Sequence, residues 1–169
     1  MSKLYLITGP AGVGKSTISR IIAESKEKSA LIEGDEIYNF IKGGYISPWL
    51  EGNHLDVFWE NCVDVIHNFL KRDYVVVFNY IIGKDKFETL KHVFSDVSVK
   101  FIVLMVDEET IIKRDKERRE DWQMGERAVV LLNEFKNDNY DAKYVLDTSK
   151  LSVEESVNEL ETNKRFVLK

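Results

Sequence analysis

A short stretch near the N-terminus, GPAGVGKST at residues 9–17, combines glycines with a lysine and two hydroxyl side chains. Glycines let backbone N–H groups turn toward phosphate oxygens with no Cβ in the way. Lys15 adds a positive charge for the β- and γ-phosphates, and the Ser16 hydroxyl is a ligand for Mg²⁺. The spacing Gly9-x-x-x-x-Gly14-Lys15-Ser16 matches the Walker A pattern completely. It predicts a site for a nucleoside triphosphate with Mg²⁺.

The residues around this stretch supply the context that the pattern needs. An apolar run at 3–8 predicts a buried strand before the loop, and isoleucines at helical spacing predict a helix over 15–25 after it. The helix N-terminus would add its dipole to the phosphate site. We therefore expect nucleotide contacts from Gly9, Ala11, Gly12, Val13, Gly14, Lys15, Ser16 and Thr17.

Composition limits the remaining possibilities. The chain has 169 residues, a net charge of −5 and a single cysteine, Cys62. This length predicts one domain over residues 1–169, and the acidic balance argues against a broad nucleic-acid surface. No apolar run approaches the roughly 18 residues of a membrane span. One cysteine cannot form an internal disulfide, so we expect a cytoplasmic protein with no membrane partner.

Strand and helix patterns alternate along the rest of the chain. Strands are expected at 3–8, 30–32, 74–80, 97–106 and 143–149, and helices at 15–25, 54–71, 85–93, 107–121, 125–138 and from Ser152 onward. Such alternation predicts a parallel sheet covered by helices on both faces. The expected fold class is α/β, as a three-layer P-loop NTPase fold with a five-stranded parallel sheet.

Two polar positions follow neighbouring strands of this expected sheet. Glu33-Gly34-Asp35 comes directly after the second strand, at the carboxyl edge where ligands bind in such sheets. The third strand ends in Asn79, where many P-loop enzymes carry an acid. Because Asn has no charge, the Mg²⁺ role shifts to Ser16, Glu33 and Asp35. Capping of the next helix is the alternative role for the two acids.

The motifs together resemble a known group of proteins. KLYLITGPAGVGKST, IEGDEI, GGYISPW, KRDKERRED followed by WQMGER, and LDTSKLS occur in the order seen in small P-loop kinases. The chain resembles the gluconate/shikimate-kinase-like and chloramphenicol-phosphotransferase-like group over nearly its whole length, and most of all bacterial gluconate kinases. The resemblance implies a helical lid at about 114–127. A Ras-type GTPase is not indicated, because no Asn-Lys-x-Asp is present.

The resemblance also implies roles for individual residues. Asp35 would orient the acceptor hydroxyl or accept its proton, and Glu33 would hold Mg²⁺ through water. Arg114 and Arg118, four residues apart on one expected helix face, would close over the triphosphate. Ion pairs within the helix, such as Glu117 with Arg114, are the alternative for these arginines.

The other expected contacts divide between the two substrates. Thr148 and Ser149 follow the last expected strand, where similar kinases place the adenine-side loop. The acceptor pocket would be shaped by the loop at 43–53 and by Tyr45, Trp49, Asn79, Tyr80, Arg119 and Arg127. Packing at a strand end or over the core is the alternative for the aromatic members of this set.

The expected function is an ATP- and Mg²⁺-dependent kinase with Lys15, Asp35, Arg114 and Arg118 as its catalytic residues. The acceptor would be a hydroxyl of a small molecule, and the resemblance names a sugar acid such as gluconate. An antibiotic, a nucleoside or a nucleic-acid 5′-hydroxyl remains an alternative acceptor. The alternative function is a nucleotide-binding regulatory protein or slow NTPase. The sequence is compatible with a monomer or a homodimer.

Overall fold

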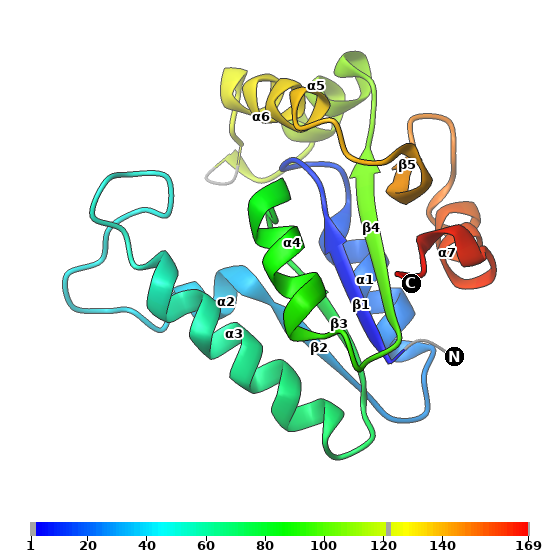
Figure 1. Ribbon diagram of the computed structural model, residues 1–169. Coiled ribbons are helices and arrows are strands. Elements are labelled where there is room, and N and C mark those ends of the chain that lie inside the picture. The colour runs from blue at the N-terminus through cyan, green and yellow to red at the C-terminus, as the bar shows by residue number, and fades with distance from the viewer. Residues whose placement is uncertain (1–2, 121–122, 169) are drawn as a thin grey trace.

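A sheet of five parallel strands lies at the centre of the structure, a computed structural model that describes residues 3–120 and 123–168. The strands are β1 (Leu4–Thr8), β2 (Ser29–Glu33), β3 (Val75–Asn79), β4 (Val99–Met105) and β5 (Val145–Asp147). Their order in the sheet is β2-β3-β1-β4-β5 (Figure 1). This is the expected five-stranded parallel sheet of an α/β P-loop protein.

The register of the sheet brings the candidate site residues to one edge. Ile7 of β1 pairs with Asn79 of β3, which in turn pairs with Glu33 of β2. On the other side of β1, Thr8 pairs with Val103 of β4. Because all of these strands are parallel, the turns that follow β1, β2 and β3 leave the sheet side by side.

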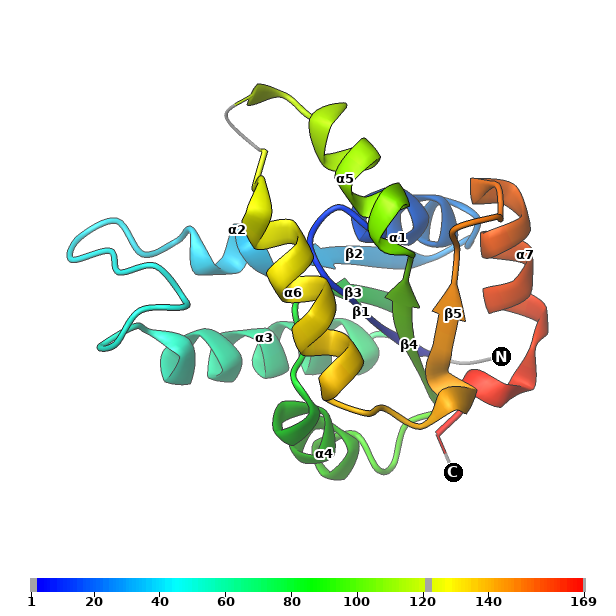
Figure 2. The ribbon, with the colours of Figure 1, turned by 90° about the horizontal axis from the view of Figure 1, so that it is seen from above.

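Helices cover both faces of the sheet, as the alternating pattern predicted. The helices α1 (Lys15–Glu24) and α7 (Val153–Thr162) cover one face, and α3 (Leu55–Leu70) and α4 (Lys84–Val93) cover the other (Figures 1 and 2). Side chains of β1 alternate between the two cores. Leu4 and Leu6 belong to the α3–α4 core, whereas Tyr5 and Ile7 belong to the α1–α7 core.

The remaining helices lie near the carboxyl edge of the sheet. The short α2 (Gly34–Tyr38) follows β2 directly, while α5 (Glu108–Lys116) and α6 (Glu126–Asn137) lie beyond the end of β4 (Figure 1). The loop 39–54 connects α2 to α3 and extends away from the sheet (Figure 2). Within the described residues, no helix is both long and apolar enough to span a bilayer.

Two elements are shorter than their sequence patterns predicted. The helix expected over 107–121 is α5 and ends at Lys116, since its very polar sequence offers little apolar face beyond the first turns. Position 121 itself lies outside the described residues. The last strand spans only Val145–Asp147, because Ala142–Tyr144 forms a 3₁₀ turn before it.

Side-chain caps mark the starts of two helices. The Asp107 side chain accepts a hydrogen bond from the Thr110 N–H at the start of α5. Ser152 and Glu155 form a complete capping box at the start of α7, with both reciprocal hydrogen bonds present. These two caps fix where the chain turns back into a helix after β4 and after β5.

The lone cysteine provides a test of the packing between α3 and the sheet. Cys62 has no exposed surface, and burial raises the pKa of its thiol to about 12. Because the thiolate is the reactive form, we predict that an aromatic disulfide reagent at pH 8 labels the folded protein about a hundredfold or more slowly than the unfolded protein. The absorbance of the aromatic thiolate that the reagent releases measures both rates. Equal rates would contradict this packing.

Candidate active site

The loop between β1 and α1 has the backbone conformation that a phosphate cradle requires. Gly9, Gly12 and Gly14 all have positive φ angles, of 142°, 86° and 98°. A Cβ at Gly9 would lie 2.3 Å from the carbonyl oxygen of Leu104, so only glycine lets the loop leave β1 against β4. The hydroxyls of Ser16 and Thr17 are on exposed residues at the N-terminus of α1.

Lys15 is folded over this loop. Its Nζ donates hydrogen bonds to the carbonyl oxygens of Gly9 at 2.8 Å and Pro10 at 2.9 Å. Burial lowers the pKa of Lys15 to about 8, the Asp35 carboxylate opposes this shift, and the Arg118 charge adds to it. Lys15 is thus near enough to both Asp35 and Arg118 for their charges to act on it.

The acidic turn lies across from the lysine. Asp35 is in the first turn of α2, and burial raises the pKa of its carboxyl, with the Lys15 charge opposing the rise and the Glu33 charge adding to it. Gly34 between the two acids packs against an aromatic ring, since a Cβ there would lie 2.6 Å from Cδ2 of Tyr80. Glycine at this position therefore lets Asp35 come close to the end of β3.

Asn79 and Glu33 lie together at the ends of β3 and β2. The Asn79 side chain donates a hydrogen bond from Nδ2 to Oε1 of Glu33, with 3.5 Å between the two atoms. Asn79 is 5% exposed and is not among the residues that line the large cleft described below. The expected contact of Asn79 with an acceptor stays a prediction. The observed hydrogen bond makes Asn79 a neighbour of Glu33, the residue expected to hold Mg²⁺ through water.

Of the two principal arginines, Arg114 lies on the expected helix and Arg118 does not. Arg114 is on α5 and donates to the carbonyl oxygens of Val13 at 3.0 Å and Thr148 at 3.4 Å, so it does not serve a helix-surface ion pair with Glu117. Arg118 lies beyond the end of α5, so the expectation that both arginines share one helix face was wrong. The chain turns there because the Arg118 N–H bonds to the Asp115 carbonyl oxygen.

Asp115 is a site residue that the sequence did not reveal. It is 4% exposed, and its carboxylate accepts hydrogen bonds from the backbone N–H groups of Met124 and Gly125, at 2.8 Å for Gly125. The same carboxylate pairs with Arg118, with 3.4 Å between Oδ1 and Nη1. It thus connects the end of α5 to the segment that leads into α6. Nothing in its charged sequence surroundings distinguished it from a solvated acid.

A small cavity of about 220 Å³ lies beside the phosphate loop. It is lined by Val13, Gly14, Thr17, Arg114 and Thr148, together with residues of α1 and of the start of α7. Thr148 therefore lines a cavity beside the phosphate loop, and its expected contact with the base stays a prediction. Ser149 is used differently, because its hydroxyl accepts a hydrogen bond from the Asp107 N–H and tethers the end of β5 to the start of α5.

A larger cleft of about 810 Å³ opens on the other side of Asp35. Its walls come from α2, the 39–54 loop, α3, the turn after β3, α4 and α6. Four of the expected site residues line it, namely Asp35, Trp49, Tyr80 and Arg127. The cleft also contains residues that the sequence did not single out, namely Trp59, Lys84, Lys86 and Glu134. They come together only when α3, α4 and α6 pack.

The 39–54 loop is held at both of its ends. The Tyr38 hydroxyl donates to the Ile46 carbonyl oxygen at 2.6 Å, and the His54 ring lies 2.8 Å from the Gly44 carbonyl oxygen. Tyr45 packs edge-on against Tyr38 rather than lining the cleft. Arg119 is exposed beyond α5 and does not line the cleft either. The acceptor roles expected for Tyr45 and Arg119 stay predictions.

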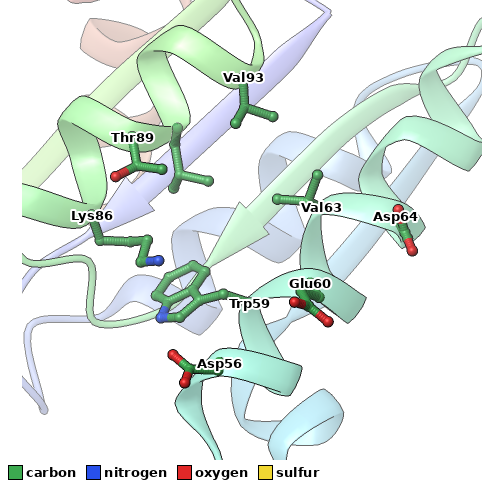
Figure 3. Close-up of a pocket in the computed structure, with 9 residues that line it drawn as sticks. Asp56, Trp59, Glu60, Val63, Asp64, Lys86, Thr89 and Val93 are labelled. Atoms are coloured by element: carbon green, nitrogen blue, oxygen red, sulfur yellow. The ribbon is translucent and has the colours of Figure 1, made fainter.

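A further cavity of about 580 Å³ lies between α3 and α4 (Figure 3). Asp56, Glu60 and Asp64 of α3 and Lys86 and Thr89 of α4 are among the residues that line it. Trp59 and Lys86 line both this cavity and the large cleft. Figure 3 shows the Lys86 side chain extending to the Trp59 indole, and its Nζ lies 5.1 Å from the ring centroid. The pair therefore forms a wall shared by the two cavities.

The residues at the phosphate loop fit a triphosphate with Mg²⁺. The glycines leave the cradle free of Cβ atoms, and Lys15, Arg114 and Arg118 supply positive charge beside it. Among the described residues, no cluster of three or more His, Cys, Asp or Glu side chains could hold a metal on its own. Mg²⁺ is usually held by one or two protein groups plus substrate phosphates, and Ser16 and Glu33 suit that arrangement.

Solved structures with the same fold come from several proteins. A tunicamycin resistance protein from Deinococcus radiodurans aligns with a TM-score of 0.69 and 19% identity, over 95% of this chain and 94% of its own. A gluconokinase from Sinorhizobium meliloti 1021 aligns with a TM-score of 0.65 and 19% identity, over 94% and 89%. A thymidylate kinase from Candida albicans aligns with a TM-score of 0.63 and 17% identity, over 99% and 95%. These likenesses show the fold.

The family comparison rests on sequence. Among curated proteins, none matches the chain significantly. A family model described as an AAA domain matches residues 6–131, which include the phosphate loop, the acidic turn, Asn79 and both principal arginines. This match covers well over half of the chain. The phosphate loop within it follows β1, the central strand of the sheet with the order β2-β3-β1-β4-β5. The chain therefore belongs to the AAA domain family of P-loop proteins.

Proposed function

We propose that the protein is an ATP-dependent phosphotransferase that moves the γ-phosphoryl group of ATP to a hydroxyl of a small molecule. The observation that carries the proposal is the position of Asp35. Its carboxylate lies within electrostatic reach of Lys15 on the phosphate side and lines the large cleft on the other. A carboxylate between a phosphate cradle and a second cleft is placed to serve both substrates of a transfer reaction.

The residues divide the work of the transfer. The phosphate loop and Lys15 would hold the phosphates, while Arg114 and Arg118 in a lid at about 114–127 would place positive charge beside the transferred group. The acceptor oxygen forms a bond to the γ-phosphorus, the bond from that phosphorus to the ADP oxygen breaks, and the acceptor proton passes to Asp35. The raised pKa of Asp35, caused by burial, suits it to receive that proton.

Ser16 and Glu33 would hold the Mg²⁺ ion, Glu33 through a water molecule. The ion supplies charge neutralisation on the phosphates when it is bound. The Asn79 amide is placed to orient Glu33, because its Nδ2 hydrogen-bonds to Oε1 of that side chain. In this arrangement Asn79 substitutes for a Walker B acid in position but not in charge.

The sequence resemblance and the structures of the same fold point to different acceptors. The resemblance to gluconate kinases favours a sugar acid, whereas structures of the same fold carry the names of a tunicamycin resistance protein and a thymidylate kinase as well as a gluconokinase. An antibiotic, a nucleoside or a nucleic-acid 5′-hydroxyl is thus an alternative acceptor. We expect the protein to act in the cytoplasm, where a single buried thiol remains reduced, as a monomer or a homodimer.

A second candidate function follows from Asn79. Because the end of β3 carries no acid, the protein could bind and slowly hydrolyse a nucleotide as a regulator, with no acceptor. The position of Asp35, between Lys15 of the phosphate loop and the large cleft, supports transfer instead. Acceptor-stimulated release of ADP separates the two functions.

The first prediction from this proposed function concerns Asp35. In a screen of sugar acids, sugars, nucleosides and antibiotics, we expect at least one compound to stimulate ADP release. Asp35→Ala should lower the stimulated rate by about 10²- to 10⁴-fold, because the acceptor hydroxyl loses its base. ATP binding by the variant serves as the control for folding. Tight ATP binding by the parent with no stimulation by any compound would favour the regulatory function.

The second prediction concerns the phosphate cradle. Lys15→Ala should weaken binding of ATP with Mg²⁺ by roughly 10- to 100-fold, since a charge-assisted hydrogen bond to phosphate is lost. Isothermal titration calorimetry measures the affinity. Lys26→Ala is a matched control, because that lysine pairs with Glu161 far from the loop. Parental affinity and turnover in Lys15→Ala would show that the nucleotide binds elsewhere.

The third prediction concerns Asp115 as a positioning residue. Asp115→Asn keeps an oxygen for the Met124 and Gly125 N–H groups but loses the charge that pairs with Arg118. We expect Asp115→Asn to lower kcat by about tenfold in the parent and by less than about twofold in an Arg118→Ala background. The second effect is smaller because both substitutions remove the same ion pair between Asp115 and Arg118.

Arg114→Ala is the control background for this cycle. The Arg114 guanidinium donates to the carbonyl oxygens of Val13 and Thr148, whereas the arginine that pairs with the Asp115 carboxylate is Arg118, so the full effect of Asp115→Asn should persist there. Equal effects of Asp115→Asn in the Arg118→Ala protein and in the parent would limit Asp115 to a structural role.

A further inference from the structure

The large cleft has walls that a sugar acid would not use. Apolar and aromatic side chains from four segments line part of it, namely Pro48, Trp49, Leu55, Trp59, Ile81 and Leu131. An open-chain polyol presents hydroxyls on every side, and each hydroxyl that loses water needs a new hydrogen-bond partner. Apolar walls offer none. They favour an acceptor with an extended apolar surface of its own.

The charges of the cleft do not favour an anionic acceptor either. Its lining contains three cations, Lys84, Lys86 and Arg127, against four carboxylates, one of which is Asp35. Two of the cations already lie on aromatic rings, Lys86 on Trp59 and Arg127 on Trp49. A lining with a net charge of −1 gives a carboxylate ligand no electrostatic gain over water. An uncharged acceptor fits this balance better.

Trp49 is the most unusual side chain in the cleft. It is 60% exposed, although burial of an indole is strongly favourable, and it lies in a loop that is anchored through Tyr38 and His54. The Arg127 guanidinium lies 4.8 Å from the centroid of its ring, so α6 holds the indole at the cleft. A fixed indole with most of its surface still open is a platform for a second flat group.

The size of the cleft agrees with a ligand larger than a simple sugar acid. Its volume of about 810 Å³ lies in the upper part of the range of roughly 300–1,000 Å³ that holds drug-sized ligands. Asp35 and Tyr80 both line it. Burial and the nearby Asp35 carboxylate raise the pKa of Tyr80, so its hydroxyl stays protonated and can donate to an acceptor oxygen. The reacting hydroxyl would lie at this end.

From these observations we infer that the acceptor is an uncharged, hydroxyl-bearing molecule with a planar unsaturated ring that stacks on Trp49. This inference rests on the proposed phosphotransferase function and names its substrate class. The ring occupies the open surface of the indole, the apolar walls cover the rest of the molecule, and its hydroxyl reaches Asp35. Nucleosides and aromatic antibiotics share this chemistry, whereas gluconate does not.

Binding without turnover provides the test. Equilibrium dialysis, in the presence of Mg²⁺ and a non-hydrolysable ATP analogue, compares two planar-ring probes, uridine and chloramphenicol, with the sugar acid gluconate and the neutral polyol glucitol. We expect at least one ring probe to bind on the order of tenfold or more tightly than gluconate and glucitol. Trp49→Leu should weaken that binding by about tenfold, the range of a single base–aromatic stack, whereas Trp49→Phe should restore most of it.

Leu50→Ala is the matched control, because Leu50 is the adjacent exposed apolar residue and does not line the cleft. It should leave binding of the ring probe unchanged. Gluconate or glucitol binding as tightly as the ring probes would overturn the inference, as would failure of both ring probes to bind or parental binding in Trp49→Leu. Failure of the proposed function is recognised separately, because a protein that binds the ATP analogue but releases no ADP in response to any bound compound has no transfer activity, whichever probe its cleft prefers.

Discussion

The rest of the site depends on the close contact between the end of β1 and β4. At Gly9 the backbone runs so near the Leu104 carbonyl that a Cβ would lie 2.3 Å from its oxygen. This contact fixes where the phosphate loop leaves the sheet. The parallel register then places Asn79 beside Ile7 and Glu33 beside Asn79, so the acidic turn opens next to the loop. One glycine contact and one register thus determine where Lys15 and Asp35 meet.

The second half of the site is assembled by contacts that link the lid to the acceptor cleft. Asp115 holds Arg118 and the N–H groups that precede α6, and α6 carries Arg127 against the indole of Trp49. These contacts join the segment proposed as a lid to the 39–54 loop. In the proposed transfer reaction, they would couple the binding of the two substrates.

Much of the fold followed from local patterns. Apolar runs marked the strands, and the Walker A spacing marked Lys15, because glycines, a lysine and a hydroxyl in that order have few other uses. The rule that ligands bind at carboxyl edges predicted a site role for Asp35, and that role stays a prediction. Asp115 did not follow, because its partners are backbone N–H groups that reach it only after the chain turns back. The stack of Trp49 with Arg127 depends likewise on packing between distant segments, which no local pattern contains.

In the proposed reaction, the γ-phosphoryl group leaves the phosphate loop for a molecule bound on the far side of Asp35. The most direct measurement follows the label of γ-³²P ATP after incubation with the protein, Mg²⁺ and a compound that binds the cleft. We predict a labelled phosphate ester of that compound, formed in proportion to ADP. Label recovered only as inorganic phosphate, with the compound bound but unchanged, would contradict it.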